Sequence, residues 1–162
     1  MAVVTVEKAL QLWDEALQTQ VHKTETIAVK AAKGYVLAED IMASTDVPAF
    51  PKSAMDGYAI AYEENRNEYI VDGIIGAGVV WEQPVEPGHA VRIMTGAPVP
   101  DTCDTVIMQE QVVGSGELGT TITMQGKYKC GDHIIPQGEE CCAGTIVIPR
   151  GTEVTSTVQT IL

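Results

Sequence analysis

Basic residues are scarce in this sequence: ten Lys and Arg stand against 22 Asp and Glu, which gives a formal net charge of −12 at pH 7. Because neutralising a nucleic-acid backbone requires clustered Lys and Arg, this balance argues against DNA or RNA as a ligand. It also disfavours binding to an anionic membrane surface. The surplus of carboxylates instead favours solubility, or a divalent cation where carboxylates gather.

Long apolar runs are also missing, since none approaches the roughly 18 residues that a membrane-spanning helix requires. The first residues, "MAVVTVEKALQLWDEALQ", place acids among the apolar positions. They lack the basic segment followed by an apolar segment that is typical of a signal peptide. We therefore expect a soluble globular protein in the cytoplasm.

The sequence has no Cys-x-x-Cys pair and no phosphate-binding loop. Neither G-x-x-x-x-G-K-[ST] nor G-x-G-x-x-G occurs, so the glycine-rich stretches do not predict a nucleotide cradle. Reduced thiols are expected in the cytoplasm, and the spacing does not favour a structural zinc site. We interpret the four cysteines as buried, reduced thiols: Cys103, Cys130, Cys141 and Cys142.

Helical patterns occur only near the two ends of the chain. Apolar residues recur at three- and four-residue steps from Val6 to Leu17, which predicts a helix that begins after Thr5 and ends near Gln20. A short strand is expected at 27–29, then a short helix before Leu37 and a strand through Ile41. Near the other end, Thr155 or Ser156 is expected to cap a short final helix.

The middle of the chain has a different texture. Between Asp46 and Gly144 the short runs "YIV", "AVRIM", "TVIMQ" and "TTITM" alternate with turn residues, and "GIIGAGVVW" is interpreted as a loop or hairpin connection. We therefore predict a mostly β, α+β fold. A β-rich insertion at 46–141 emerges from a small α+β base domain formed by 1–45 and 142–162.

Two motifs remain after these exclusions, "PAFPKSAMDGYAI" at 48–60 and "VRIMTGAPVPDTCDTVIMQEQV" at 91–112. Taken alone, Asp56-Gly57 is typical of a hairpin turn, and Thr95-Gly96 of another turn. The alternative for Asp56 is a hard oxygen ligand for Mg²⁺, with Gly57 allowing close backbone approach. Thr95 could likewise place its hydroxyl on a phosphate or molybdate oxygen.

Together with "VIMQEQ" and the later "AGTIVIPRGTEV", these motifs resemble the molybdopterin molybdenumtransferase family, of the MoeA and gephyrin E-domain type. The resemblance covers nearly the entire chain but only the N-terminal half of the family. It implies a protein of molybdenum cofactor biosynthesis that inserts molybdate into adenylylated molybdopterin, with Mg²⁺-dependent hydrolysis of the adenylate. Because the family's pterin-binding domain has no counterpart here, we expect this chain alone to be inactive.

The resemblance also implies roles for particular residues and a mode of assembly. Asp56 and Thr95 match catalytic motif positions in a cleft that faces the partner subunit, and the chain is expected to form a homodimer through its base domain. Asp56 and Glu140 are the implied Mg²⁺ ligands. The implied substrate-binding residues are Ser53, Met55, Gly57, Gly96 and Glu110.

One stretch departs from the family pattern. Where the family commonly has a basic run followed by Gly-Glu-Asp, this chain has "IIPQGEE" at 134–140, with Gln137 in place of Arg and Glu140 in place of Asp. The lost positive charge is expected to weaken any phosphate contact there, and the longer Glu shifts its oxygens. An alternative function is a non-catalytic dimerisation or docking module that acts with a separate pterin-binding protein.

Overall fold

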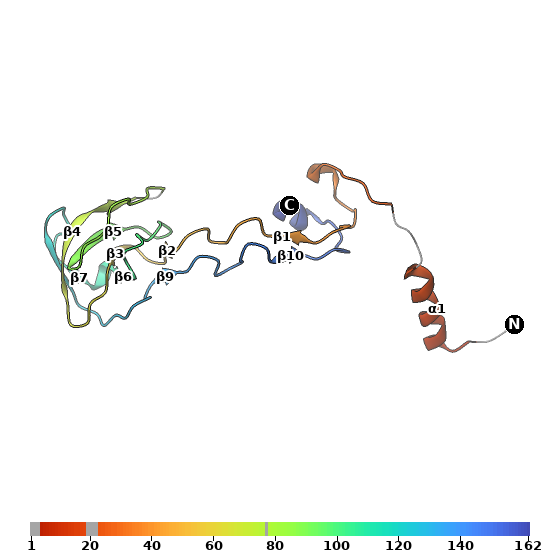
Figure 1. Cartoon of the computed structure of the whole chain (residues 1–162), viewed down its shortest axis with the longest axis horizontal. Coiled ribbons are helices and arrows are strands. Elements are labelled where there is room, and N and C mark those ends of the chain that lie inside the picture. The colour runs from red at the N-terminus through yellow and green to blue at the C-terminus, as the bar shows by residue number, and fades with distance from the viewer. Residues whose placement is uncertain (1–3, 19–22, 77) are drawn as a thin grey trace. The chain divides into compact units, whose positions relative to one another are not determined.

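The computed structural model describes residues 4–18, 23–76 and 78–162 (Figure 1). The chain divides into two compact units, one formed by the described parts of 1–41 together with 148–162, and the other by 42–147. The division lies a few residues outside the 46–141 boundaries expected from the sequence. The fold is mostly β, as predicted.

The 42–147 unit is built on one six-stranded sheet, in which the strand order is β6-β3-β5-β4-β8-β7. Only β4 and β5 run parallel; every other neighbouring pair is antiparallel. The strands are β3 (Gly57–Ile60), β4 (Glu68–Ile75), β5 (His89–Ile93), β6 (Thr105–Met108), β7 (Val112–Val113) and β8 (Thr121–Met124). The runs expected to be strands in this region are confirmed.

Side chains on both faces of this sheet are buried, which explains why its central strands are short apolar runs rather than strict alternations. All four residues of β3 are buried. One apolar cluster contains Ala59, Ile75, Val91, Ile93 and Val106; the other contains Ile60, Tyr69, Val71, Ile107 and Ile122. The motifs at 48–60 and 91–112 thus each contribute a strand, β3 and β5, to this buried part of the sheet.

The interpretation of "GIIGAGVVW" as a loop is wrong for its first residues, because β4 continues to Ile75. Its pairing with β5 shifts register between Val71 and Gly73, and Ile75 is fully buried. A Cβ at Gly73 would lie 2.7 Å from ring atoms of Trp81. This glycine therefore serves close packing inside a strand rather than a turn.

Several short elements lie outside the main sheet. Strands β2 (Lys52–Ser53) and β9 (Ile134–Ile135) pair antiparallel, and η2 (Gln109–Gln111) follows β6 directly. Strands β1 (Ile41–Met42) and β10 (Ile146–Ile148) form a second two-stranded pair.

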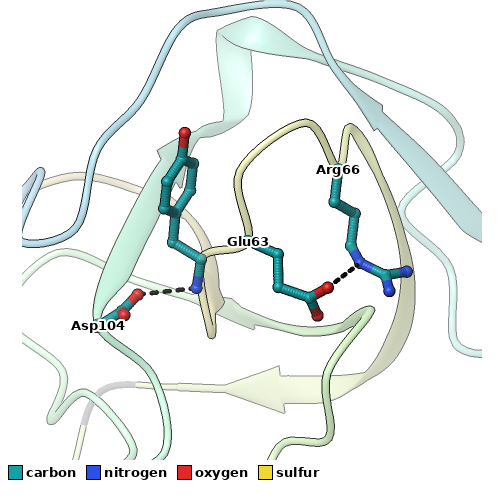
Figure 2. Close-up of polar contacts among 4 residues, drawn as sticks. Glu63, Arg66 and Asp104 are labelled. Carbon is teal, nitrogen blue, oxygen red and sulfur yellow. Dashed lines mark hydrogen bonds and ion pairs between the residues drawn. The ribbon is translucent and has the colours of Figure 1, made fainter.

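The connection from β3 to β4 is held by two polar contacts (Figure 2). Arg66 Nε lies 3.1 Å from Glu63 Oε2, and Asp104 Oδ1 accepts the Tyr62 N–H at 2.8 Å. Arg66 also packs over Gly88, where a Cβ would lie 2.6 Å from the guanidinium. Its charge is therefore committed to this loop.

The other unit contains α1 (Val6–Gln18), η1 (Val29–Ala31) and α2 (Ser156–Ile161). Gln20, the predicted end of the first helix, lies outside the described residues. The strand expected at 27–29 is wrong, because Val29 instead begins η1, which is the short helix expected before Leu37. Thr155 caps α2 by accepting the Val158 N–H, as predicted. Among the described helices, none is long and apolar enough to cross a membrane.

All four cysteines are free thiols, but they are not all buried. Cys103 is buried, and burial raises the pKa of its thiol to about 12. Cys130 and Cys142 are exposed, which corrects the expectation from sequence. Cys130 stays protonated because a hydrogen bond with Asp104 raises the pKa of its thiol.

Candidate functional site

The two motifs meet in space, because β2 pairs with the segment that follows β5. Gly96 N donates to Ser53 O at 2.8 Å, and Ser53 N donates to Ala97 O at 3.0 Å. A bridge between Lys52 and Pro98 continues this pairing. Residues 52–57 and 94–98 thus form one rigid loop pair, although they are about forty positions apart in the sequence.

Asp56 and Thr95 are joined directly across this loop pair. Asp56 Oδ1 accepts both the backbone N–H and the side-chain hydroxyl of Thr95, each at 2.7 Å. These bonds, the backbone one foremost, lower the pKa of the Asp56 carboxyl below its ordinary value of 3.8. Asp56 is therefore a carboxylate at neutral pH, and its Oδ2 has no hydrogen-bond partner among the described residues.

The backbone of Asp56 is fixed as well. Gln109 N donates to Asp56 O at 3.0 Å, which continues the β3–β6 ladder one step beyond Gly57. Glu110, a predicted substrate-binding residue, follows Gln109 within η2 and is exposed. The ladder thus brings Glu110 to the same end of the sheet as Asp56 and Thr95.

Ser53 and Met55 shape the loop in different ways. Ser53 is fully buried; its hydroxyl donates to Met55 O at 2.6 Å and also accepts the Met55 N–H at 3.3 Å. That arrangement braces the turn from beneath, so Ser53 acts on Met55 and Asp56 rather than facing solvent. The Met55 side chain is 38% exposed.

The two predicted glycines also differ. Gly57 is buried in β3, and a Cβ there would collide with the backbone carbonyl of Ile107 on β6. Gly96 has a φ of +81°, with open space where its Cβ would stand. Gly57 is therefore required for strand packing, whereas Gly96 is required for the left-handed turn beside Thr95.

Glu140, the second predicted Mg²⁺ ligand, pairs with Lys52. The distance from Lys52 Nζ to Glu140 Oε1 is 3.8 Å, and the Glu140 side chain is largely exposed. Within the described part of the chain, no three His, Cys, Asp or Glu side chains gather as a ready metal cage. A magnesium ion that takes one carboxylate, several waters and substrate phosphate would not need such a cage.

A hollow of about 570 Å³ opens beside the Thr95-Gly96 turn in the same unit. Its walls include the rings of Phe50 and Trp81 together with Pro98 and Pro100, and Gly96 lies on its rim. Sequence reasoning did not identify this hollow. The only signal was the density of prolines and aromatic residues around the two motifs.

Comparison with known proteins identifies the arrangement. Residues 4–162 match the family model described as the MoeA N-terminal region (domain I and II). The chain belongs to this family. A molybdopterin molybdenumtransferase from Staphylococcus epidermidis is 42% identical over 147 residues, which cover 86% of this chain and 34% of that protein. Its counterpart from Bacillus subtilis is 36% identical, covering 92% of this chain and 38% of that protein.

Solved structures agree with these sequence relatives. A crystal structure of a molybdopterin biosynthesis moeA protein from Pyrococcus horikoshii OT3 superposes with a TM-score of 0.81 at 32% identity. The match covers 99% of this chain and 43% of that one. The chain therefore has the family's N-terminal fold, and it spans only about a third of the length of the curated relatives named above.

Proposed function

We propose that this chain is the N-terminal part of a molybdopterin molybdenumtransferase, which inserts molybdate into adenylylated molybdopterin and hydrolyses the adenylate. The observation that carries the proposal is the Asp56–Thr95 pair, held on two loops that the fold aligns. The names of the relatives support the pathway and the substrates. The ionised Asp56, with one oxygen uncommitted, supports the catalytic role.

In this proposal the chain's own residues orient substrate and metal. Thr95 donates two hydrogen bonds to Oδ1 of Asp56, which fixes the orientation of the carboxylate. The other oxygen, Oδ2, would then hold Mg²⁺. The ion would supply charge neutralisation at the reacting phosphate. Because the Thr95 hydroxyl donates to Asp56, its oxygen lone pairs remain available to accept from water or a protonated substrate oxygen. Met55 and Glu110 would contact the bound substrate from the exposed side.

The proposed assembly is a homodimer, and α1 supports it. The helix has no buried residue, yet it carries a stripe of large apolar side chains at helical spacing. Val6, Leu10 and Trp13 are 72%, 63% and 68% exposed, and Leu17 is 45% exposed. A stripe of this kind requires a covering surface in solution, and a second copy of the chain would supply it symmetrically.

The function is tested with the complete reading frame that encodes this chain, expressed in a bacterial strain that lacks its own molybdenumtransferase. We expect restored activity of molybdenum enzymes, and no restoration by residues 1–162 alone. The purified proteins should show the same contrast in release of AMP from adenylylated molybdopterin on addition of molybdate. Turnover by residues 1–162 that disappears in D56A would contradict the requirement for further domains.

If neither the complete protein nor residues 1–162 restore activity, the result favours the alternative function, a non-catalytic dimerisation or docking module. That alternative predicts capture of a separate pterin-binding protein of the same pathway, which size-exclusion chromatography of the mixture would detect.

A further inference from the structure

Arg92 occupies a particular place beside the proposed site. It lies in β5, three residues before Thr95, and pairs directly with Tyr58 of β3, two residues after Asp56. On its other side it pairs with Ile74 of β4, which is 55% exposed. Because directly paired residues project from the same face of a sheet, the arginine stands between these two side chains. The exposure of Ile74 shows that this end of the face is open to solvent.

The Arg92 guanidinium has no ion pair or hydrogen bond among the residues that the structure describes, although the residue is only partly exposed. Two other cations of the unit are paired: Arg66 with Glu63 at 3.1 Å and Lys52 with Glu140 at 3.8 Å. None of the Arg92 guanidinium nitrogens is among the buried polar atoms without a partner, so the charged group is open to solvent. Strand pairing thus fixes the backbone of Arg92, while its guanidinium has no partner in the described part of the chain.

The charge of Arg92 also reaches the site. It contributes to the lowered pKa of the Asp56 carboxyl, after the two hydrogen bonds from Thr95 and by a smaller amount. Acidic groups at this end of the sheet include Asp56 and Glu110, and both would repel an anionic substrate. Arg92 is the cation of β5 that can offset them.

We infer that Arg92 binds a tetrahedral oxyanion at the Asp56–Thr95 site, and that it does so directly through its guanidinium. A planar guanidinium presents paired N–H donors that match two oxygens of a phosphate, and molybdate presents the same tetrahedral oxygens. The inference rests on the proposed function, because that function requires both a phosphate and a molybdate. It adds a substrate-binding residue from this chain to a site otherwise built of acids and hydroxyls.

The test is a titration of the isotopically labelled chain 1–162, followed by NMR at the backbone amides and at the arginine Nε–H groups. Adenosine monophosphate with Mg²⁺ forms one arm and sodium molybdate the other, so that the two sources of oxyanion are distinguished. The variants are R92Q, R92K and R150Q. R150Q is the matched control, since it removes the same charge from the other unit of the chain.

We expect at least one anion to shift the Arg92 Nε–H resonance together with the Thr95 and Gly96 amides. R92Q should weaken this binding by at least about tenfold, R92K by less, and R150Q should leave it unchanged. A response to one anion alone assigns the site to that anion. Binding that shifts Thr95 without Arg92, R92Q that binds as wild type, or no binding of either anion would overturn the inference.

The wild-type Arg92 resonance decides the question even if R92Q does not fold. Failure of this inference is also distinct from failure of the proposed function. Restored molybdenum-enzyme activity with no anion at Arg92 would leave the transferase assignment in place and remove only the role of this residue.

Discussion

Gln137 Nε2 donates a 2.6 Å hydrogen bond to Oδ2 of Asp46, which lies 91 residues earlier in the chain. The other oxygen of Asp46 accepts the Ala143 N–H at 2.7 Å. One carboxylate thereby ties together the segment that enters the β-rich part of the chain and the segment that leaves it. Position 137 was expected from the sequence to bear on phosphate binding, but its side chain is engaged in this structural contact.

Substitution of Gln137 should therefore change stability. Gln137→Ala removes the donor and should lower the Tm, by no more than about 4 °C because the site is exposed. Gln137→Arg keeps a donor and adds a charge opposite Asp46, so its Tm should equal or exceed that of wild type. Differential scanning calorimetry at pH 7 measures both variants. An unchanged Tm in Gln137→Ala would show that the hydrogen bond contributes nothing in solution.

The stability supplied by Asp46 should depend on pH. The hydrogen bonds from Ala143 and Gln137 lower the pKa of this carboxyl below its ordinary value of 3.8. A group with a depressed folded-state pKa stabilises the fold above the unfolded-state value, and this contribution is lost as pH falls through the folded-state value. The Tm difference between wild type and Asp46→Asn should thus be constant near neutrality and shrink below about pH 3.8. A difference that grows on acidification would contradict this assignment.

Asp56→Asn should separate folding from chemistry. The amide keeps an oxygen that can accept from Thr95, so we expect a Tm close to that of wild type. Loss of the negative charge removes the proposed hold on Mg²⁺, and activity of the complete protein should fall by at least about a hundredfold. AMP release on molybdate addition measures the rate. A variant that melts well below wild type yet keeps its activity would show that Met55-Asp56-Gly57 is only a turn.

Local sequence patterns predicted the elements whose burial follows a simple rule. The strands at 105–108 and 121–124 are short apolar runs between turn residues, and the amphipathic stripe of α1 has helical period. Gly73 was misread because a glycine that makes room for Trp81 looks in the sequence like a glycine that makes a turn. Trp81 lies in the same run, and only the folded structure shows that its ring stands where a Cβ of Gly73 would be.

At the candidate site, too, the sequence predicted the residues but not the contacts between them. Asp56 and Thr95 were named from their motifs. The two hydrogen bonds from Thr95 to Oδ1 of Asp56 form only because the fold aligns their loops. Arg92 stands inside one of those motifs, yet the sequence alone treats it as an ordinary strand residue. The proposed role of Arg92 depends on which carboxylates lie near it and whether they are already paired. The arrangement of the strands in the sheet determines both.

Gly57 and Gly96 should respond differently to the same small change. Gly57→Ala places a methyl group against the Ile107 carbonyl on the neighbouring strand, so it should destabilise the fold severely, by more than about 2 kcal/mol. In Gly96→Ala the added methyl group contacts no other atom. The variant should lose only about 1 kcal/mol of unfolding free energy, because alanine is disfavoured in the left-handed conformation. Urea unfolding followed by tryptophan fluorescence compares the two. Equal losses would show that β3 and β6 can separate enough to admit the methyl group.

The apolar stripe of α1 should control assembly. Leu10 and Trp13 are 63% and 68% exposed in the single chain, and a homodimer would bury them. We expect light scattering to give twice the chain mass of 17.3 kDa at high micromolar concentration, and Leu10→Glu to shift it toward the monomer. Gln11→Glu adds the same charge one position away, off the stripe, and should leave the mass unchanged. Because helix propensity is similar for Leu and Glu, a monomeric Leu10→Glu with unchanged helical circular dichroism would locate the contact on the stripe itself. A wild-type chain that stays at 17.3 kDa would remove α1 as the dimer contact.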